Sequence, residues 1–481
     1  MKNKYVAAID VGTTKIVTLL GKRNENNKLE LIGFSRLDSK GIRRGEVLNP
    51  EQAAVVVSNS VADLQKRTGL KISDVFVGVV GQHIRIIKSR TNIIRDHNED
   101  DITAEEVDRL KKDAAKIALK QGEEILHVLP QGYFVDGEVA DIVSDPVGMI
   151  GKKLDGNFSM VVGNVDSLKR IRKCIQKAGL NIKEIILEPL ASSESVLYDV
   201  EKETGVALVD IGGGTSDVAI FYDNVLRHSA VIPCGGNIVT SDIKTACGLS
   251  EQVAEDVKVQ FGMALSDKAD ENKVVVIPPS VPGHQPKEIS FSTLANIIQA
   301  RMEEIIDAVK FHIENSGFSD KLGSGIVITG GGAMLKHLVQ LFQFSTGKPI
   351  RIGYPGAHLA GDSESINEPN YATGVGLLMK GLEYMDEHGW DTPTVTQNVE
   401  IDEKMTEEPV PIGEKAEKGK KIRERKEIKI KTPREIPNLF EMVKRYFDDD
   451  EAVKNKMNTK DENEDEDEAI KKKMNTTIEV K

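Results

Sequence analysis

Two aspartate–glycine turns, far apart in the chain, contain the residues best suited to chemistry. The first turn reads Asp10, Val11, Gly12, Thr13, Thr14, Lys15, and the second reads Asp210, Ile211, Gly212, Gly213, Gly214, Thr215. Glycine lets a backbone approach a phosphate closely, its N–H groups can point at phosphate oxygens, and threonine hydroxyls add donors. Two facing aspartates can hold a hydrated Mg²⁺, which prefers oxygen ligands.

Either turn alone would be explained by an ordinary β-hairpin. The second turn repeats the strand, glycine turn and strand order of the first, and a third glycine run follows another strand at Gly330, Gly331 and Gly332. Together the three glycine-containing turns predict a phosphate-binding site. In this site Asp10 and Asp210 are predicted to hold a magnesium ion.

The elements around the first turn follow from the hydrophobic pattern. Residues 4–10, 15–21, 29–36, 74–80, 158–163 and 182–187 are predicted strands, and residues 50–69 and 167–179 are predicted helices. Strands that come first and then alternate with helices are typical of a mixed sheet with helices on its faces.

A second copy of this order begins at Gly205. Residues 206–211, 217–222, 225–231 and 326–329 are predicted strands, and residues 237–247, 250–261, 292–315 and 370–384 are predicted helices. We therefore predict an α/β protein with two domains, each built on a mixed sheet.

Composition narrows the class of protein. The chain has 481 residues, 39% apolar and 29% charged, and a net charge of −12, which argues against a nucleic-acid-binding protein. The three cysteines, Cys174, Cys234 and Cys247, have no metal-ligand spacing, which favours a reducing cytosol over a disulfide-built secreted protein. No apolar run is long enough to span a bilayer, and we expect no signal peptide before Asp10.

The three glycine runs together resemble the actin-like ATPase superfamily. By this resemblance, residues 10–15 and 210–217 are the two phosphate loops, and Gly330, Gly331, Gly332 and Ala333 form the adenosine loop. Residues 187–191 and 371–376 resemble the two interdomain connectors, and Glu255 and Lys258 the helix that contacts ribose or adenine. The resemblance implies that ATP with Mg²⁺ lies between two halves whose hinge motion reports its state.

The position of an inserted subdomain selects a family within the superfamily. Only a short segment separates the third strand from the first helix, so the insertion seen there in actin and in rod-shape filament proteins is absent. Extra material instead lies between residues 80 and 158, with predicted strands at 85–95 and 124–134 and a helix at 103–119 that begins with a Thr103–Glu106 capping box. This order resembles the FtsA family of bacterial cell-division proteins, and an MreB-like rod-shape protein is the alternative.

The family resemblance implies a function and its partners. Members bind Mg-ATP, polymerise, and tether filaments of the tubulin-like protein FtsZ to the cytoplasmic side of the cell membrane at the division site, where other division proteins follow. ATP hydrolysis can be weak in such proteins, so enzyme activity is left open. Glu188 either orients the attacking water or is a structural acceptor. The FtsZ tail is expected on the helix at 292–315, with Arg301 and Glu304 as candidate contacts that could equally be solvated charges.

The C-terminal region has a different composition. Residues 391–481 contain 20 basic and 24 acidic residues, so we expect most of this region to be disordered. One amphipathic segment, 438–448, interrupts it with Leu439, Phe440, Met442, Val443, Tyr446 and Phe447. Basic residues upstream suit anionic lipid headgroups, whereas the acidic run after the segment does not. The segment is therefore predicted to bind membrane lipids, with docking on a protein partner as the alternative.

These observations give a predicted domain division. The first domain comprises 1–82, 158–200 and 366–388, and the inserted subdomain comprises 83–157. The second domain comprises 201–241 and 318–365 with a subdomain at 242–317, and the tail begins at 389.

Overall fold

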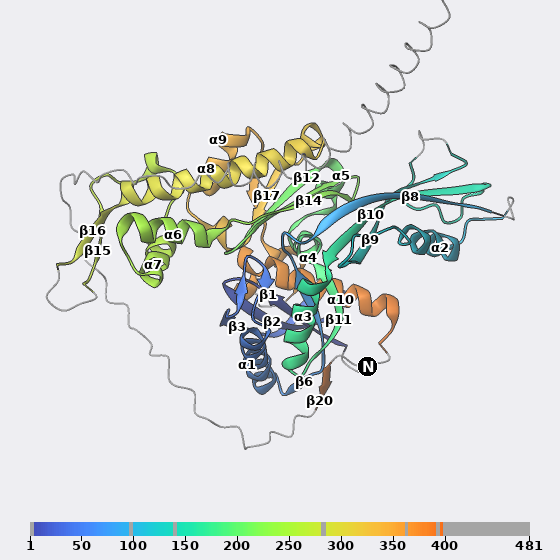
Figure 1. Ribbon diagram of the computed structural model, residues 1–481, viewed down its shortest axis with the longest axis horizontal. Coiled ribbons are helices and arrows are strands. Elements are labelled where there is room, and N and C mark those ends of the chain that lie inside the picture. Colours follow the sequence, from blue (N-terminus) through green and yellow to red (C-terminus); the bar gives the residue numbers. More distant parts are fainter. Residues whose placement is uncertain are drawn as a thin grey trace, which may run out of the picture. The chain divides into compact units, whose positions relative to one another are not determined.

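The computed structural model describes residues 4–95, 100–137, 142–279, 285–360, 364–390 and 395–397. Three main sheets organise these residues (Figure 1). The amphipathic segment 438–448 and the charged residues around it lie outside the described residues. Among the helices of the described residues, none is long and apolar enough to cross a membrane.

The first sheet has six strands in the order β11-β7-β1-β2-β3-β19. Its strands are β1 (Tyr5–Val11), β2 (Lys15–Arg23), β3 (Leu29–Asp38), β7 (Asp74–Val79), β11 (Asn181–Leu187) and β19 (Leu359–Ala360). The three N-terminal strands pair antiparallel through tight turns, while β7 and β11 add to β1 in parallel.

Helices cover both faces of this sheet, as the mixed pattern predicted. Helices α1 (Pro50–Thr68) and α3 (Val165–Lys177) pack on one face, and α10 (Ala372–His388) packs on the other. Helix α1 is capped at both ends. The Asn49 side chain accepts hydrogen bonds from N–H groups of the first turn, and Gly69 ends the helix with a φ of 66°.

The second sheet has five strands in the order β14-β13-β12-β17-β18. They are β12 (Val206–Ile211), β13 (Ser216–Tyr222), β14 (Val225–Ile232), β17 (Ile326–Thr329) and β18 (Ile350–Ile352). The antiparallel β14-β13-β12 followed by parallel β17 and β18 repeats the order β3-β2-β1-β7-β11. The internal repeat seen in the sequence is therefore a repeat of topology.

Helix α4 (Glu188–Val196) connects the two halves: its Ala191 packs in the core of the first sheet and its Val196 in the core of the second. The helices of the second half are α5 (Asp199–Thr204), α6 (Gly236–Cys247), α7 (Glu251–Phe261), α8 (Phe291–Asn315) and α9 (Leu338–Thr346). Helix α8 lies alongside α6 and contacts β13 and β14 (Figure 1). A small hairpin, β15 (Val274–Ile277) with β16 (Lys287–Ser290), precedes α8.

The insert between β7 and α3 forms its own sheet in the order β8-β10-β9. Its elements are β8 (Arg85–Ile94), α2 (Ala104–Ala114), β9 (Glu123–Val135) and β10 (Lys153–Asn164). The capping box is present: Thr103 Oγ1 accepts from Glu106 N, and Thr103 N donates to Glu106 Oε2.

One expectation about the length of an element was wrong. Helix α2 ends at Ala114 rather than near residue 119, and Ile117 and Leu119 pack against the insert core beyond the helix. The region after residue 389 is described only in part, and a short strand lies there. Val395–Gln397 forms strand β20, which pairs with β6 (Leu70–Ile72) and buries Val395 in the first core. Two further short strands, β4 (Ile42–Arg43) and β5 (Glu46–Val47), pair with each other.

Candidate functional site

The structure brings the two aspartate–glycine turns face to face. A Cβ built on Gly213 would overlap Thr14 Oγ1, and one built on Gly214 would lie 2.5 Å from Thr13 Oγ1. The β1–β2 and β12–β13 turns therefore meet through glycine backbone and threonine hydroxyls. Side chains at these glycines would separate the turns, which explains why the residue type is required.

The second turn is closed from behind by the start of α6. Gly236 N donates to Gly212 O at 2.9 Å and Asn237 N donates to Gly213 O at 2.8 Å. A Cβ on Gly235 would overlap Gly212 O, so this approach also depends on glycine. The adjacent glycines at 235 and 236 are a signal of close backbone approach that can be recognised in the sequence.

Asp210 lies at the end of β12 and is bound by both connectors. Its Oδ2 accepts from Ser192 Oγ at 2.9 Å and from Thr373 Oγ1 at 3.2 Å. Ser192 belongs to α4 and Thr373 to α10, and a Cβ on Gly376 would overlap Ala191 O where these helices cross. The predicted connectors thus form a helix crossing that fixes one of the two predicted metal ligands.

Four carboxyl groups gather around the two turns: Asp10, Glu188, Asp210 and Asp217. Burial raises the pKa of Asp10 to about 6, and Lys15 and Asp210 modify it in opposite directions. Burial also raises the pKa of Glu188 well above its usual value, with further increases from Asp10, Asp217 and Asp210.

Asp217 is the member of this cluster that had no assigned role. Its side chain is 6% exposed, and its Oδ1 accepts no hydrogen bond from the described residues. Burial, followed by the negative charge of Asp210, raises its pKa well above the usual value. A buried carboxylate oxygen without a partner beside three other acids fits a bound cation.

The cluster fits magnesium only in a hydrated or phosphate-bound form. Within the described ranges, no three acidic, histidine or cysteine side chains converge closely enough to hold a metal ion by themselves. Mg²⁺ keeps several waters and often shares its ligands with phosphate oxygens, so Asp10 and Asp210 would act partly through water. A divalent ion held there would offset the carboxylate charge and orient phosphate oxygens.

Lys15 is a cation that interacts with this cluster. Its Nζ donates to Asn370 O and lies 4.5 Å from the centre of the Tyr371 ring. Burial lowers the pKa of Lys15 to about 8, although Asp10 and Asp210 oppose this shift. The first turn is therefore joined by one side chain to the segment that begins α10.

The remaining predicted nucleotide residues lie on α7 and on the turn after β17. Lys258 Nζ donates to Glu255 Oε2 at 2.8 Å, to Thr240 Oγ1 at 2.8 Å and to Gly236 O at 3.0 Å. Gly330 has a φ of 82°, and a Cβ there would overlap Asp210 Oδ1. The glycine run continues through Gly331 and Gly332 into a short 3₁₀ turn that buries Ala333. These residues border the second turn from two sides.

Arg301 and Glu304 lie away from the turns, on α8. The Arg301 side chain is 4% exposed, and its guanidinium binds Asp242 at 2.6 and 3.2 Å and Glu304 at 2.7 Å. A partner could meet Arg301 directly only if these ion pairs rearranged. The outward face of α8 instead carries residues such as Asn296, Ala300 and Glu303.

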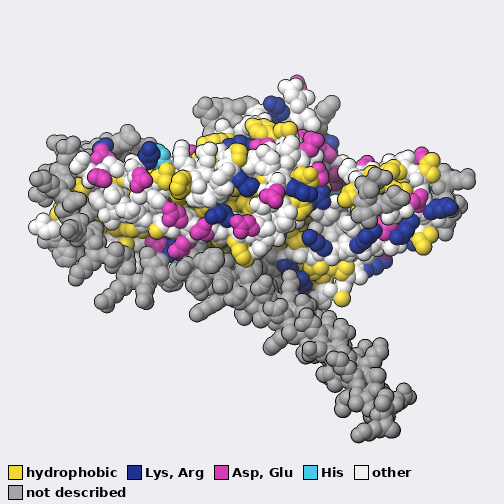
Figure 2. All heavy atoms as spheres, turned by 90° about the horizontal axis from the view of Figure 1, so that it is seen from above, with side chains coloured by type: hydrophobic (Ala, Val, Ile, Leu, Met, Phe, Trp, Pro, Cys, Tyr) yellow, Lys and Arg dark blue, Asp and Glu magenta, His cyan; other side chains and the backbone are white. Residues whose placement is uncertain are grey.

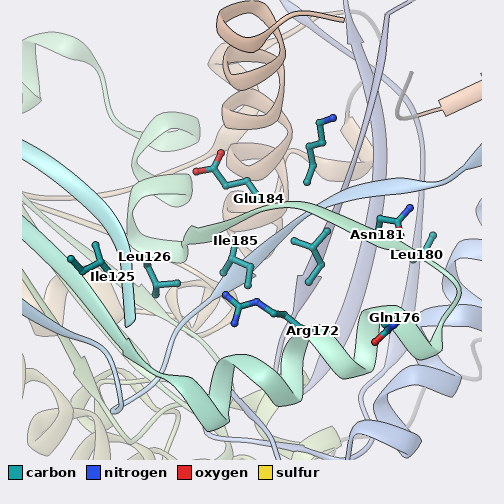
Figure 3. Close-up of a pocket in the computed structure, with 10 residues that line it drawn as sticks. Ile125, Leu126, Arg172, Gln176, Leu180, Asn181, Glu184 and Ile185 are labelled. Carbon is teal, nitrogen blue, oxygen red and sulfur yellow. The ribbon is translucent and has the colours of Figure 1, made fainter. Parts of the chain in front are cut away.

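A groove of about 520 Å³ lies elsewhere, beside β11 (Figure 3). Ile125 and Leu126 of β9, Arg172 and Gln176 of α3, and residues 180–185 line it. Figure 3 shows Arg172 reaching from α3 toward Ile185 of β11. None of the predicted nucleotide residues lines this groove.

Comparison with known proteins identifies the family. The chain matches the family model described as "Cell division protein FtsA" over residues 207–376, and the model "SHS2 domain inserted in FTSA" over residues 81–162. It is 36% identical to the cell-division protein FtsA of Pseudomonas aeruginosa over 381 residues, covering 79% of this chain and 90% of that protein. It is 33% identical to FtsA of Escherichia coli over 387 residues, covering 79% and 91%.

A solved structure supports the fold. A chain of the PilM–PilN type IV pilus biogenesis complex aligns with a TM-score of 0.54 at 13% identity, covering 78% of this chain and 98% of that chain. The fold is the actin-like ATPase fold expected from the paired turns. The position of the insert and the sequence identities set aside the MreB-like alternative. The chain belongs to the FtsA family of actin-like cell-division proteins.

Proposed function

We propose that this cell-division protein binds Mg-ATP between its two aspartate–glycine turns, polymerises, and tethers FtsZ filaments to the cytoplasmic face of the membrane at the division septum. The observation that carries the nucleotide site is the contact of the Gly213–Gly214 backbone with Thr13 and Thr14 beside a cluster of buried carboxyl groups. Backbone donors, hydroxyls and acidic groups are together suited to a magnesium-bound phosphate.

The nucleotide would act mainly as a conformational switch. Asp210 is bonded to both connector helices, so a ligand at the turns would bias the packing of α4 against α10. Glu188 begins α4 beside Asp10, Asp210 and Asp217, where it could orient a water for slow hydrolysis or simply accept a hydrogen bond. We propose that this motion shifts the domains given from sequence, with the insert ending after β10 at Asn164 rather than at residue 157.

A nucleotide-binding assay tests the site. Full-length protein, Asp210→Asn and Asp155→Asn are titrated with a fluorescent ATP analogue in Mg²⁺ and in EDTA. Asparagine at 210 still accepts hydrogen bonds from Ser192 and Thr373, so the connectors keep a partner. We expect Asp210→Asn alone to lose the magnesium-dependent part of the affinity. Asp155 is a buried acid in the insert, paired with Lys153, and serves as the control. Equal affinities in all three proteins would refute the magnesium site.

The FtsZ tail is proposed to bind the subdomain that contains α8. A buried Arg301 would shape this surface through Asp242 and Glu304. Charge reversal on the outward face, Glu303→Lys, should weaken binding of an FtsZ C-terminal peptide, because a charged contact across an interface is reversed. Asp320→Lys, an exposed reversal beyond the helix, is the control. Unchanged binding in Glu303→Lys would move the site off this face.

Membrane attachment is proposed for the segment with Leu439, Phe440, Met442, Val443, Tyr446 and Phe447. A single short amphipathic helix binds lipid weakly, so polymerisation would supply avidity by carrying many anchors at once. Flotation with anionic vesicles and Mg-ATP compares the full chain, a chain ending at Trp390, and the double variant Phe440→Glu/Phe447→Glu. Flotation of the full chain alone supports the tether. Equal flotation of all three assigns lipid binding to the body, and no flotation favours a protein partner for the segment.

Later division proteins are proposed to meet the insert. Its strand β8 exposes Lys88, Arg90 and Ile94. On the face of the molecule drawn in Figure 2, basic and apolar side chains lie together toward the right-hand end. Such a mixture suits protein contacts better than lipid headgroups alone.

A further inference from the structure

Strand β9 of the insert pairs irregularly with β10. Gly132 pairs with Asn157 and Pro130 with Phe158, so Gln131 has no partner in the ladder. The register shifts again between His127 and Ile125, which leaves Leu126 without a partner. Such bulges bend a strand and re-aim its side chains, often beside functional sites.

The first bulge faces the second half of the molecule. Gln131 Nε2 donates to Leu226 O at 3.0 Å, and Arg227 Nη1 donates to Gln131 O at 3.0 Å. Leu226 and Arg227 belong to β14, the edge strand of the second sheet. The bulged glutamine therefore ties the insert to the half that carries the second aspartate–glycine turn.

The second bulge faces the first connector. Leu126 packs against the apolar cluster that includes Leu187 and Val196 at the two ends of α4. Next to it, His127 Nε2 accepts a hydrogen bond from Leu187 N at 3.1 Å. His127 is thus the insert residue that bonds to the backbone immediately before Glu188.

The chemistry of His127 suits an acceptor. Burial, with a smaller contribution from the positive charge of Lys380, lowers the pKa of His127 to about 4, so the ring is neutral near pH 7. A neutral imidazole keeps one nitrogen as an acceptor, here Nε2. Leu187 is the residue before the first turn of α4 and has no side-chain cap, so this bond directs the start of the helix.

Helix α4 carries two groups of the candidate site. Glu188 is its first residue, and Ser192 one turn later donates to Asp210. A rotation of α4 would therefore move a carboxyl group and a hydrogen-bond donor to the second turn at the same time. His127 lies at the end of α4 where such a rotation would be controlled.

We propose that His127 is a positioning residue of the nucleotide site, and that bulged strand β9 couples the insert to both halves of the actin-like core. The inference rests on the proposed function, because it gives the same site a connection to the insert. Coupling of this kind is reciprocal: a nucleotide that orders α4 orders β9, and a partner that holds the insert tightens nucleotide binding.

Substitutions at His127 test the proposal on the full-length chain. His127→Leu keeps an apolar volume but removes the acceptor of Leu187 N–H, whereas His127→Gln keeps a side-chain acceptor. His312→Gln is the matched control, since it removes another histidine whose pKa burial lowers to about 4, on α8. The affinity for a fluorescent ATP analogue with Mg²⁺ is measured for each. We expect about a fivefold loss in His127→Leu, from one hydrogen bond, and values within about twofold of wild type in the other two.

Hydrogen–deuterium exchange without nucleotide gives a second readout at residues 187–196. Faster exchange there in His127→Leu, restored in His127→Gln, supports positioning, and a merely structural loss would also raise exchange in unrelated strands such as β18. Wild-type affinity in His127→Leu, or an equal loss in His127→Gln or His312→Gln, overturns the proposal. If wild-type protein binds no nucleotide, the proposed function fails, and the exchange pattern alone then decides whether His127 positions α4. Identical exchange at residues 187–196 in all variants overturns the proposal that His127 positions α4.

Discussion

Breaking the Arg301–Asp242 ion pair should destabilise the fold strongly. The guanidinium contacts both carboxylate oxygens, at 2.6 and 3.2 Å, with side-chain exposures of 4% for Arg301 and 12% for Asp242. Two charges about 4 Å apart at an effective dielectric of about 20 attract by about 4 kcal/mol. Arg301→Met leaves Asp242 buried without this partner, and such a loss costs about 3–5 kcal/mol.

The measurement is urea unfolding of four proteins: wild type, Arg301→Met, Asp242→Leu and the double variant. We expect each single variant to lose about 3 kcal/mol and the double variant to lose far less than the sum, because neither charge of the Arg301–Asp242 pair is then left buried without the other. Lys310→Met breaks an exposed pair with Asp307 on the same helix and should cost less than about 1 kcal/mol. A single-variant loss as small as this control, or strictly additive losses, would refute the reasoning.

The outcome bears on the role of Arg301 in partner binding. If the ion pair holds α8 against α6, Arg301→Met should weaken FtsZ-peptide binding only together with stability. Glu303→Lys should weaken peptide binding without such a loss. Reduced binding by Arg301→Met at unchanged stability would instead indicate a direct contact.

Three further results are expected. Gly330→Ala should remove nucleotide binding and lower the thermal midpoint, because its φ of 82° and the overlap of a Cβ with Asp210 both oppose a side chain; unchanged binding would contradict this. Acid should destabilise the fold between about pH 6.5 and 4, because the folded-state pKa values of His127 and His312 are about 4 and unfolded histidine takes up protons more readily. Each pKa shift is worth up to about 3 kcal/mol. In the double variant His127→Gln/His312→Gln, the free energy of unfolding in urea should therefore change less with pH over this window. An unchanged slope of that free energy against pH would exclude these two histidines as the cause. Val395→Glu should release β20 and raise proteolysis after Trp390 without altering nucleotide affinity, since Val395 is 6% exposed in the first core; equal protease resistance would show that β20 adds nothing.

Local sequence was sufficient for most of the elements. Short apolar runs predicted β12 and β17 with the observed bounds, and the Thr103–Glu106 capping box predicted where α2 begins. Period and capping are properties of a few consecutive residues, so they can be recognised without the fold. The C-terminal limit of α2 could not be recognised in this way, because Ile117 and Leu119 pack against a core built from other elements of the insert.

Other features had no adequate local signal. The connector at 187–191 begins helix α4, although it was noticed only as a family motif. Strand β20 follows a change in composition that is typical of a linker, and it exists because β6 offers an edge to pair with. A three-residue strand is defined by its partner rather than by its own pattern.

The repeat of two strand–glycine–strand turns, each with an aspartate at the bend, could be recognised from the sequence alone. Glycine content and hydrophobic period are properties of consecutive residues, so they need no knowledge of the fold. The contact between these turns could be seen only in the folded structure. The same is true of Asp217, whose buried Oδ1 has no hydrogen-bond partner among the described residues, and of the hydrogen bonds from Ser192 and Thr373 to Asp210. The tertiary structure also decided that Arg301 is buried in ion pairs and that His127 bonds to the connector. These contacts join residues far apart in the chain, and a side chain's burial and partners depend on what the rest of the fold brings to it.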